Sequence, residues 1–376
     1  MRLAYLLALS TALHVYIGLS LVADMSSATL GALFTLLLIL SALFVPSGLL
    51  ARRITRPPVA DTLSWIGLLF MGLFSSLLVL TVLRDVLLLV LRLVGVASAG
   101  AAWEQWSALA VPLAALLASL LGFWNARRTA GVRDVDVRLA HLPLALQGFT
   151  IVQISDVHVG PTIRHRYVEK IVEAVNRLKP DLVAITGDLV DGSVPELRAQ
   201  VAPLSRLVSR HGSFFVTGNH EYYSGVAPWM AELERLGIRV LHNEHVVIDR
   251  ADAQLVLAGV TDYSAGHFDA SHRSDPRAAM AGAPAAGVRV LLAHQPRSAP
   301  AAAEAGFDLQ LSGHTHGGQF LPWNFFVRFQ QPFTAGLHRL GRMWVYVSRG
   351  TGYWGPPKRF GAPSEITRIR LMAAAG

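Results

Sequence analysis

The chain has 376 residues, of which 52% are hydrophobic and 15% are charged, and its mean hydropathy is +0.42. This composition is too apolar for a purely soluble protein and predicts segments that cross a membrane. The absence of Cys excludes disulfides and thiolate metal sites, and the basic residues behind the net charge of +8 are scattered or lie at the ends of apolar runs, so we expect contact with a lipid bilayer and no nucleic-acid partner.

The first third of the chain contains the longest apolar runs. Residues 1–126 are predicted to form an all-α transmembrane region with about four helices, whose spans cover residues 3–22, 30–50, 63–83 and 107–124. Each run is close to the roughly 20 residues that an α-helix needs to cross the hydrocarbon layer. Residues 85–96 are also apolar, but this run is short and contains Arg92, so we expect a separate interfacial or extracytoplasmic helix there.

The first apolar run has an alternative interpretation. Arg2 followed by an apolar stretch fits a cleaved signal peptide. However, further apolar runs follow at once, and no clear small-residue cleavage site closes the first one. We therefore expect a retained span.

Arginine residues in the short loops predict the orientation of the spans. Three arginines lie within residues 52–56 and three more within residues 127–133, whereas residues 23–29 contain no Lys or Arg. Because cytoplasmic loops are enriched in Lys and Arg, we expect the N-terminus and the large C-terminal part in the cytoplasm. Two arginines in the opposite loop weaken this prediction, and a crossing by residues 85–96 would place the C-terminal part outside.

The second part of the chain alternates between strand and helix patterns. Residues 127–141 are predicted to be a linker and residues 142–371 an α/β domain. Short apolar runs rich in β-branched residues predict strands, and apolar residues three or four apart predict helices. The predicted strands cover residues 149–155, 181–187, 213–218, 238–243, 254–260, 288–294, 307–314 and 343–350, and the predicted helices cover residues 166–180, 195–210 and 230–237.

Five of the predicted strands end in polar residues of one chemical kind. In open α/β sheets, sites form beyond the carboxyl ends of the strands, so these side chains are predicted to meet in one cleft. Two carboxylates, four imidazoles and one amide suit divalent Mn, Fe, Zn or Co, and seven donors are about right for two ions that share one carboxylate. The candidate ligands are Asp156, His158, Asp188, Asn219, His294, His314 and His316.

Other polar residues near these motifs have simpler interpretations. A single Asp at a strand end is usually a turn or a helix cap, and only the five motifs together, in this order, favour a metal site. Asp191 is expected either to support the ligands or to cap a helix, and Glu221 is expected to support the ligands and not to bind metal. For nine further histidines we expect a surface position or a satisfied hydrogen bond: His14, His141, His165, His211, His242, His245, His267, His272 and His338.

The motifs ISDVHVG, TGDLVDG, GNHEYY, LSGHTHGGQ and SRGTGYWGPPKR resemble those of the calcineurin-like metallophosphoesterase superfamily, in particular its membrane-associated bacterial branch. The resemblance covers about Leu142 to Leu371. It implies an α/β sandwich in which helices flank two sheets. It also implies an integral protein of the bacterial inner membrane.

The resemblance also implies roles for individual residues. Asp156, His158 and His316 would hold one metal ion, Asn219, His294 and His314 would hold the second, and Asp188 would bridge both. His220 would contact the phosphate and protonate the leaving group. A hydroxide that bridges the two metals would attack phosphorus, with Asn219 helping to stabilise the developing charge.

These observations predict a membrane-anchored phosphoesterase that cleaves a phosphoester or pyrophosphate bond of a lipid-linked or other amphiphilic substrate. One alternative is a phosphodiesterase for soluble nucleotides, in which the spans serve only as an anchor. A second is a non-enzymatic membrane sensor or transporter with a regulatory metal domain. The spans contain almost no internal charge, which argues against a path for solutes.

Two loops have both a structural and a functional interpretation. Residues 348–361 form either a structural loop or a substrate or membrane-edge loop, in which Lys358 and Arg359 meet phosphate. Residues 320–329 are rich in aromatic side chains, which either pack in the core or enter the membrane interface beside the site.

Overall fold

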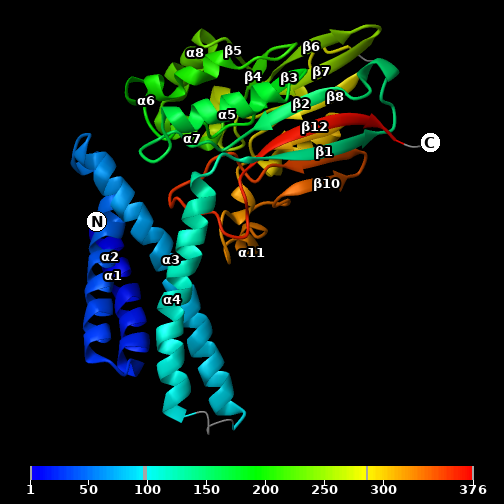
Figure 1. The fold of residues 1–376 in the computed structure, drawn as a ribbon. Helices are drawn as coiled ribbons and strands as arrows, with labels where there is room; N and C mark the ends of the chain where they lie inside the picture. The colour runs from blue at the N-terminus through cyan, green and yellow to red at the C-terminus, as the bar shows by residue number, and fades with distance from the viewer. Residues whose placement is uncertain (1, 96–99, 285–286, 375–376) are drawn as a thin grey trace. The chain divides into compact units, whose positions relative to one another are not determined.

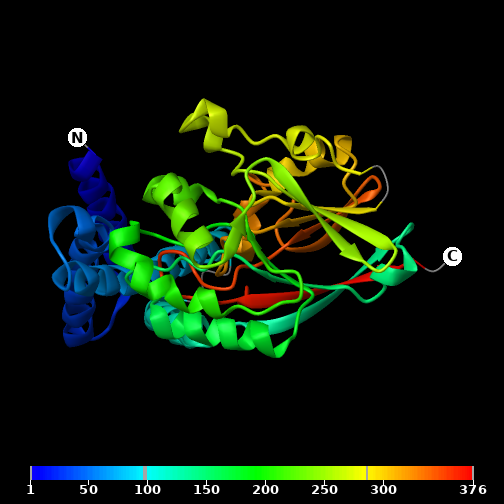
Figure 2. The same ribbon diagram turned by 90° about the horizontal axis from the view of Figure 1, so that it is seen from above.

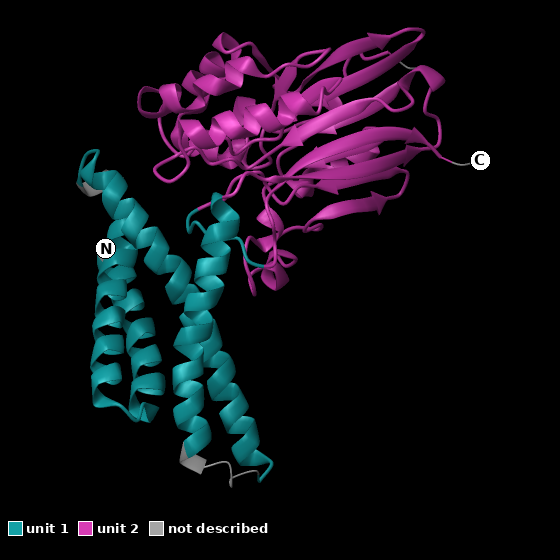
Figure 3. Ribbon diagram, in the orientation of Figure 1, with its two compact units in different colours: residues 1–127, 355–360 teal, residues 128–354, 361–376 magenta. Residues whose placement is uncertain are grey.

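The computed structural model describes residues 2–95, 100–284 and 287–374 (Figure 1). The chain divides into two compact units, which Figure 3 shows in different colours. The helical unit comprises residues 1–127 together with residues 355–360. The second unit, which we call the catalytic unit because it contains the predicted ligands, comprises residues 128–354 and 361–376.

The helical unit contains the predicted transmembrane region. In the described part of the chain, four helices are long and apolar enough to cross a membrane, which confirms the prediction from sequence. Gly48 and Gly67 let two of them approach closely, because a Cβ added at Gly48 would lie 2.6 Å from the Cα of Gly67. The helices are α1 (Arg2–Leu21), α2 (Ala28–Ile54), α3 (Val59–Leu93) and α4 (Gly100–Arg127).

The predicted separate helix at residues 85–96 is wrong. Residues 85–93 are the last turns of α3, and residue 96 lies outside the described residues. Arg84 is buried in this region and forms ion pairs with Asp24 and Asp85, and its Nε donates to Ser107 Oγ at 2.8 Å. No Gly or Pro interrupts the helix here, and buried ionic contacts hold it, so α3 continues past the predicted end of its span.

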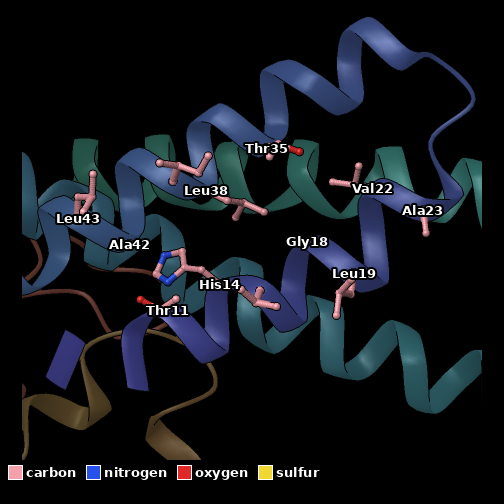
Figure 4. Close-up of a pocket in the computed structure, with 12 residues that line it drawn as sticks. Thr11, His14, Gly18, Leu19, Val22, Ala23, Thr35, Leu38, Ala42 and Leu43 are labelled. Atoms are coloured by element: carbon pink, nitrogen blue, oxygen red, sulfur yellow. The ribbon is translucent and has the colours of Figure 1, made fainter. Parts of the chain in front are cut away.

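A groove between α1 and α2 contains His14 (Figure 4). The His14 ring stacks on Phe74 with a centroid separation of 4.3 Å. Its Nε2 lies 2.8 Å from Ser41 Oγ and its Nδ1 lies 2.7 Å from the carbonyl oxygen of Ser10. Both nitrogens therefore have partners inside the bundle, as expected for a histidine with a structural role.

The catalytic unit is built on two mixed sheets. Among the described residues, six strands form the first sheet in the order β1-β12-β2-β3-β4-β5, and six form the second in the order β10-β11-β9-β8-β7-β6. The strands are β1 (Gly131–Leu139), β2 (Thr150–Ile154), β3 (Leu182–Ile185), β4 (Ser213–Phe215), β5 (Ile238–Val240), β6 (Glu244–Arg250), β7 (Ala253–Gly259), β8 (Val288–Leu292), β9 (Leu309–Ser312), β10 (Gly336–Leu340), β11 (Met343–Val347) and β12 (Glu365–Ala373).

The two sheets pack face to face, and their inward side chains form the main core. Ile151 and Ile369 of the first sheet meet Leu257 and Leu311 of the second in one buried cluster. Figures 1 and 2 show α5 and α6 beside the first sheet, and α9 and α10 pack on the second. The helices of this unit are α5 (His165–Arg177), α6 (Val194–Val201), α7 (Asn219–Ser224), α8 (Val226–Arg235), α9 (Pro276–Ala279), α10 (Ala299–Glu304) and α11 (Asn324–Val327).

Two predicted boundaries need correction. Most of the predicted linker at residues 127–141 is strand β1, which pairs in parallel with β12. Two cross-strand ion pairs support this pairing, Asp134 with Arg368 at 2.5 Å and Asp136 with Arg370 at 2.7 Å. The helix predicted at residues 195–210 ends earlier, because α6 stops at Val201 and a 3-10 turn follows to Arg206.

Candidate metal centre

The candidate ligands lie in loops that follow five strands. Three of these strands, β2, β3 and β4, are neighbours in the first sheet, and β8 and β9 are neighbours in the second. All five are joined within their sheets by parallel pairings, so their carboxyl ends point the same way within each sheet. The loops bring together Asp156 and His158 after β2, Asp188 after β3, Asn219 after β4, His294 after β8, and His314 and His316 after β9.

The backbone at these strand ends is strained. Five ligand candidates have positive φ angles: Asp156 (53°), His158 (55°), Asp188 (51°), His314 (70°) and His316 (52°). A left-handed conformation in a residue other than Gly costs free energy and persists only where surrounding contacts enforce it. The contacts around the site therefore hold these residues in a strained conformation that brings their side chains together.

The side chains form two groups of donor atoms. In the first group, His158 Nε2 lies 3.1 Å from His316 Nε2, which lies 3.5 Å from Asp156 Oδ1. In the second group, His294 Nε2 lies 3.2 Å from His314 Nδ1 and 3.1 Å from Asp188 Oδ2. The same Asp188 oxygen is 3.9 Å from His158 Nε2, so this carboxylate lies between the groups.

Two glycines allow the loops to approach the carboxylates. A Cβ added at Gly218 would lie 2.2 Å from Asp188 Oδ1, and a Cβ at Gly313 would lie 2.2 Å from Asp156 Oδ2. No side chain fits at either position without moving a carboxylate. Gly is therefore needed at positions 218 and 313 because there is no room for a side chain, and not because of a left-handed backbone, since neither residue has a positive φ angle.

Asp191 has a central role that the sequence did not reveal. Its Oδ1 accepts hydrogen bonds from His158 Nδ1 at 3.0 Å and from His220 Nδ1 at 2.6 Å. It therefore fixes the tautomer of both rings and turns the Nε2 of His158 toward the first donor group. A supporting position was one of the two expectations for Asp191, and nothing in the Gly-Asp-x-x-Asp spacing identifies its two partners.

The Glu221 side chain connects two of the loops. Its buried carboxylate accepts hydrogen bonds from the backbone N–H groups of Gly218 at 2.7 Å, Asp188 at 3.0 Å and Leu189 at 2.8 Å. These contacts tie the loop after β3 to the start of α7, and so hold Asp188 beside Asn219. A supporting position for Glu221 was the expectation from sequence.

Comparison with known proteins identifies the family. The sequence profile of the calcineurin-like phosphoesterase family matches residues 149–318. An uncharacterized metallophosphoesterase of Aquifex aeolicus is 32% identical over 259 residues, which cover 68% of this chain and 97% of that protein. The chain belongs to the calcineurin-like phosphoesterase family.

A bovine relative in the family is called "Transmembrane protein with metallophosphoesterase domain" and is 42% identical over 279 residues, which cover 71% of this chain. This chain spans 62% of that relative's length. An uncharacterized metallophosphoesterase of Helicobacter pylori is 38% identical over 253 residues, which cover 67% of this chain and 66% of that protein. The four apolar helices in the described residues and the name of the bovine relative identify a membrane protein.

Calcineurin-like phosphoesterases typically carry two metal ions, and the donor set of this chain fits such a centre. The Asn219 Oδ1 atom is buried and accepts no hydrogen bond from the described residues. An orphaned acceptor of this kind costs free energy unless a cation or water satisfies it. Imidazole nitrogens that face one another at 3.1 Å and 3.2 Å likewise suit a shared cation.

The electrostatics of the centre are dominated by burial and by carboxylate–imidazole pairs. Burial raises the pKa of Asp188, but the adjacent His294 imidazole outweighs this and holds the pKa well below its ordinary value. Burial lowers the pKa of His294, but the Asp188 charge holds it well above its ordinary value. Burial and the charge on His294 lower the pKa of His314 to about 3. The two imidazoles of this donor group therefore have pKa values shifted in opposite directions.

His220 has different electrostatics. Burial alone would lower its pKa, but the hydrogen bond to Asp191 and the charge of Asp188 raise the pKa of His220 to about 9. The ring contacts Trp354, at a centroid distance of 5.9 Å, and Tyr223, at 5.3 Å. With Nδ1 bonded to Asp191, the protonated ring can donate its remaining proton through Nε2.

Proposed function

We propose that this protein is a membrane-anchored, metal-dependent phosphoesterase that hydrolyses a phosphoester or pyrophosphate bond. The observation that carries this proposal is the pair of donor groups joined by the Asp188 carboxylate. Such a pair suits two cations that clamp the attacking and leaving oxygens of a displacement at phosphorus.

Each donor group would hold one divalent ion, with Mn, Fe and Zn the best candidates for this mixture of nitrogen and oxygen. Asp156, His158 and His316 would hold the first ion. Asn219, His294 and His314 would hold the second, with Asp188 bridging the two. When bound, the ions polarise the phosphoryl group and lower the pKa of bound water.

His220 would act on the leaving group. Its raised pKa, about 9, keeps the ring protonated at neutral pH, and Asp191 holds Nδ1 so that Nε2 carries the proton to be donated. The leaving oxygen would take that proton as its bond to phosphorus breaks. General acids of this kind contribute about 10²–10⁴-fold to a rate.

We propose that the substrate is amphiphilic or lipid-linked. The aromatic residues after the Gly-His-x-His motif do not pack in the core, because Trp323 is 43% exposed, Phe325 56% and Phe326 53%. They lie in and beside α11, a few residues from His316, and Phe329 and Arg328 follow them. Exposed Trp and Phe residues beside a cation are typical of groups that enter the headgroup layer of a bilayer.

Replacement of Trp323, Phe325 and Phe326 by Ser tests this substrate class. The triple variant should lose activity on a lipid-embedded phosphodiester and keep its activity on a soluble one such as bis(4-nitrophenyl) phosphate. An equal loss on both would favour a structural role for the aromatic side chains. Unchanged activity on both, with efficient hydrolysis of soluble nucleotides, would favour the soluble-nucleotide alternative.

We further propose that the catalytic unit lies in the cytoplasm of a bacterium whose inner membrane holds the helices. Four crossings within the described residues return the chain to the side of its N-terminus, and the continuity of α3 argues against a fifth. The chain has no Cys, so a single Lys170→Cys variant at an exposed position of α5 provides a probe. A membrane-impermeant maleimide should label it in broken cells and not in intact ones.

The activity itself is tested on the purified full-length protein. The protein is stripped of metal, reloaded with Mn, and incubated with the host's lipid extract or with soluble nucleotides, while ³¹P signals are followed. Metal-dependent release of phosphate products supports the enzyme. Tight metal binding without hydrolysis of any phosphoester would favour a sensor.

A further inference from the structure

The segment Gly355–Phe360, which we call the strap, belongs to the helical unit although it lies far from α1–α4 in sequence. Figure 3 shows it in the colour of the helices. The residues on either side of it, Trp354 and Gly361, belong to the catalytic unit. The polypeptide therefore leaves the catalytic unit, packs against the membrane helices for six residues and returns.

Lys358 is the centre of this packing. Of the two interpretations of this loop, the burial of Lys358 and Arg359, which are only 3% and 1% exposed, favours the structural one over contact with phosphate. The Lys358 ammonium donates to the Gly72 carbonyl oxygen at 2.9 Å, to Ser119 Oγ at 3.0 Å and to Ser76 Oγ. An ammonium has three donors, and these three acceptors use all of them.

The helices present a socket of small residues to this side chain. Gly72 and Ser76 are four apart on α3, and Ser119 and Gly122 are three apart on α4, so each pair shares one helix face. A Cβ added at Gly122 would lie 2.6 Å from Lys358 Cγ. The socket is therefore shaped for the unbranched lysine stem, and a larger residue at 122 would exclude it.

Backbone contacts hold the rest of the strap. The Arg359 N–H donates to the Gly122 carbonyl oxygen at 2.8 Å, and Asn125 Nδ2 donates to the Arg359 carbonyl oxygen at 3.2 Å.

Only three of the 33 basic residues of the chain are lysines. A compact ammonium fits a narrow socket of single acceptors, whereas the planar guanidinium of Arg requires a wider one.

The two residues that flank the strap, Trp354 and Gly361, contact residues that follow the Gly-His-x-His motif. Trp354 N–H donates to Gln319 Oε1 at 2.8 Å, and Gln319 Nε2 donates to the Trp354 carbonyl oxygen at 2.8 Å. Gly361 forms a bridge with Phe320. Gln319 is three residues from His316, and the Trp354 ring lies against His220. The residues on either side of the strap therefore contact the segment that follows His316 and the ring of His220.

We propose that Lys358 is a positioning residue, which locks the strap into the α3–α4 socket and thereby sets the place of Trp354 beside His220. This inference rests on the proposed hydrolysis for its kinetic test, but the docking of the strap can be tested without it.

The kinetic test uses the full-length protein in detergent micelles with saturating Mn and bis(4-nitrophenyl) phosphate. Lys358→Met should lower kcat about tenfold with little change in KM, because misplacement of a site by about 1 Å is costly. Its metal content should remain that of the wild type. Lys170→Met, which removes an exposed lysine of α5, is the matched control and should leave kcat unchanged.

Two further variants separate positioning from general damage. Lys358→Cys creates a unique thiol, and alkylation with 2-bromoethylamine restores an ammonium of nearly lysine length. This treatment should recover kcat, whereas neutral alkylation with iodoacetamide should not. In a Trp354→Ala background, Lys358→Met should lower kcat by less than a further twofold. Wild-type kcat in Lys358→Met, or a full tenfold loss in both backgrounds, would overturn the proposal.

A labelling test is independent of hydrolysis. Pro357 is buried in the strap, so a single Pro357→Cys variant should react slowly with a soluble maleimide and much faster when combined with Lys358→Met. Equal rates would overturn the docking of the strap. A wild-type protein that hydrolyses no phosphoester would contradict the proposed function, and the labelling rates would still decide the inference.

Discussion

Replacement of Asp191 by Asn gives the sharpest test of the acid role of His220. Asn keeps a carbonyl oxygen that can accept the Nδ1–H groups of His158 and His220, so both rings should retain their orientation. It removes the negative charge that raises the pKa of His220. The substitution therefore separates the charge of Asp191 from its geometry.

The size of the effect follows from the pKa. With a pKa of about 9, His220 is about 90% protonated at pH 8, and with the ordinary value of 6.5 only about 3% is protonated. The acid form thus falls at most about 30-fold at pH 8, and by less than about 1.5-fold at pH 6. The charge of Asp188 also raises this pKa and remains, so 30-fold is the upper limit.

The assay measures kcat from pH 6 to pH 9 at saturating Mn, because loss of a group that orients a ligand can weaken metal binding. The decline of kcat with rising pH should begin at a lower pH in Asp191→Asn. Asp252→Asn, which removes an exposed carboxylate, should keep the wild-type profile. An equal loss at pH 6 and pH 8, or a further loss when Asp191→Asn is added to His220→Asn, would refute the reasoning.

Three other predictions concern the metal centre. Asp188→Asn should abolish both metal loading and hydrolysis, measured by elemental analysis and by phosphate release. His220→Ala should keep the metals and lower the rate of hydrolysis. A fully active Asp188→Asn variant would contradict the bridging role of Asp188. Metal affinity, measured by competition with a chelator, should rise about tenfold per pH unit near neutrality. The reason is that the pKa of His294 is held well above 6.5, so this residue must lose a proton to bind a cation. A metal affinity that does not change with pH would contradict binding by His294. Gly313→Ala should displace Asp156 and lower the metal content to about one ion per chain, since the new Cβ would lie 2.2 Å from that carboxylate. Two retained ions per chain would show that the loop moves to make room for the methyl group.

The sequence predicted the buried strands well because each is a short apolar run that ends in a polar motif. β2, β3, β8 and β9 all follow this pattern, and the same pattern predicted that the residues after them would lie together. Metal binding by these residues stays a prediction. The edge strand β1 was missed because its outward residues are charged, and only its pairing with β12 at the far end of the chain shows why Asp134 and Asp136 are there.

Other features could not be predicted because they depend on contacts between distant segments. Asp191 bonds two histidines, His158 and His220, 33 and 29 positions away in the chain. Lys358 bonds residues of α3 and α4 that are more than 230 positions away. The sequence placed Lys358 in a loop, and only the fold shows that the partners of its ammonium lie among helix residues with small side chains.

The strap affects the choice of material for inhibitor discovery. A soluble surrogate that begins at residue 135 would lack the first four residues of β1 and every residue of the socket. Its Pro356, Pro357 and Lys358 would then be solvated, and the indole next to them would sample positions that the intact protein does not allow. Compounds selected on such a surrogate would be selected against positions of Trp354 that the whole chain does not adopt, so screens are better run on the whole chain in nanodiscs.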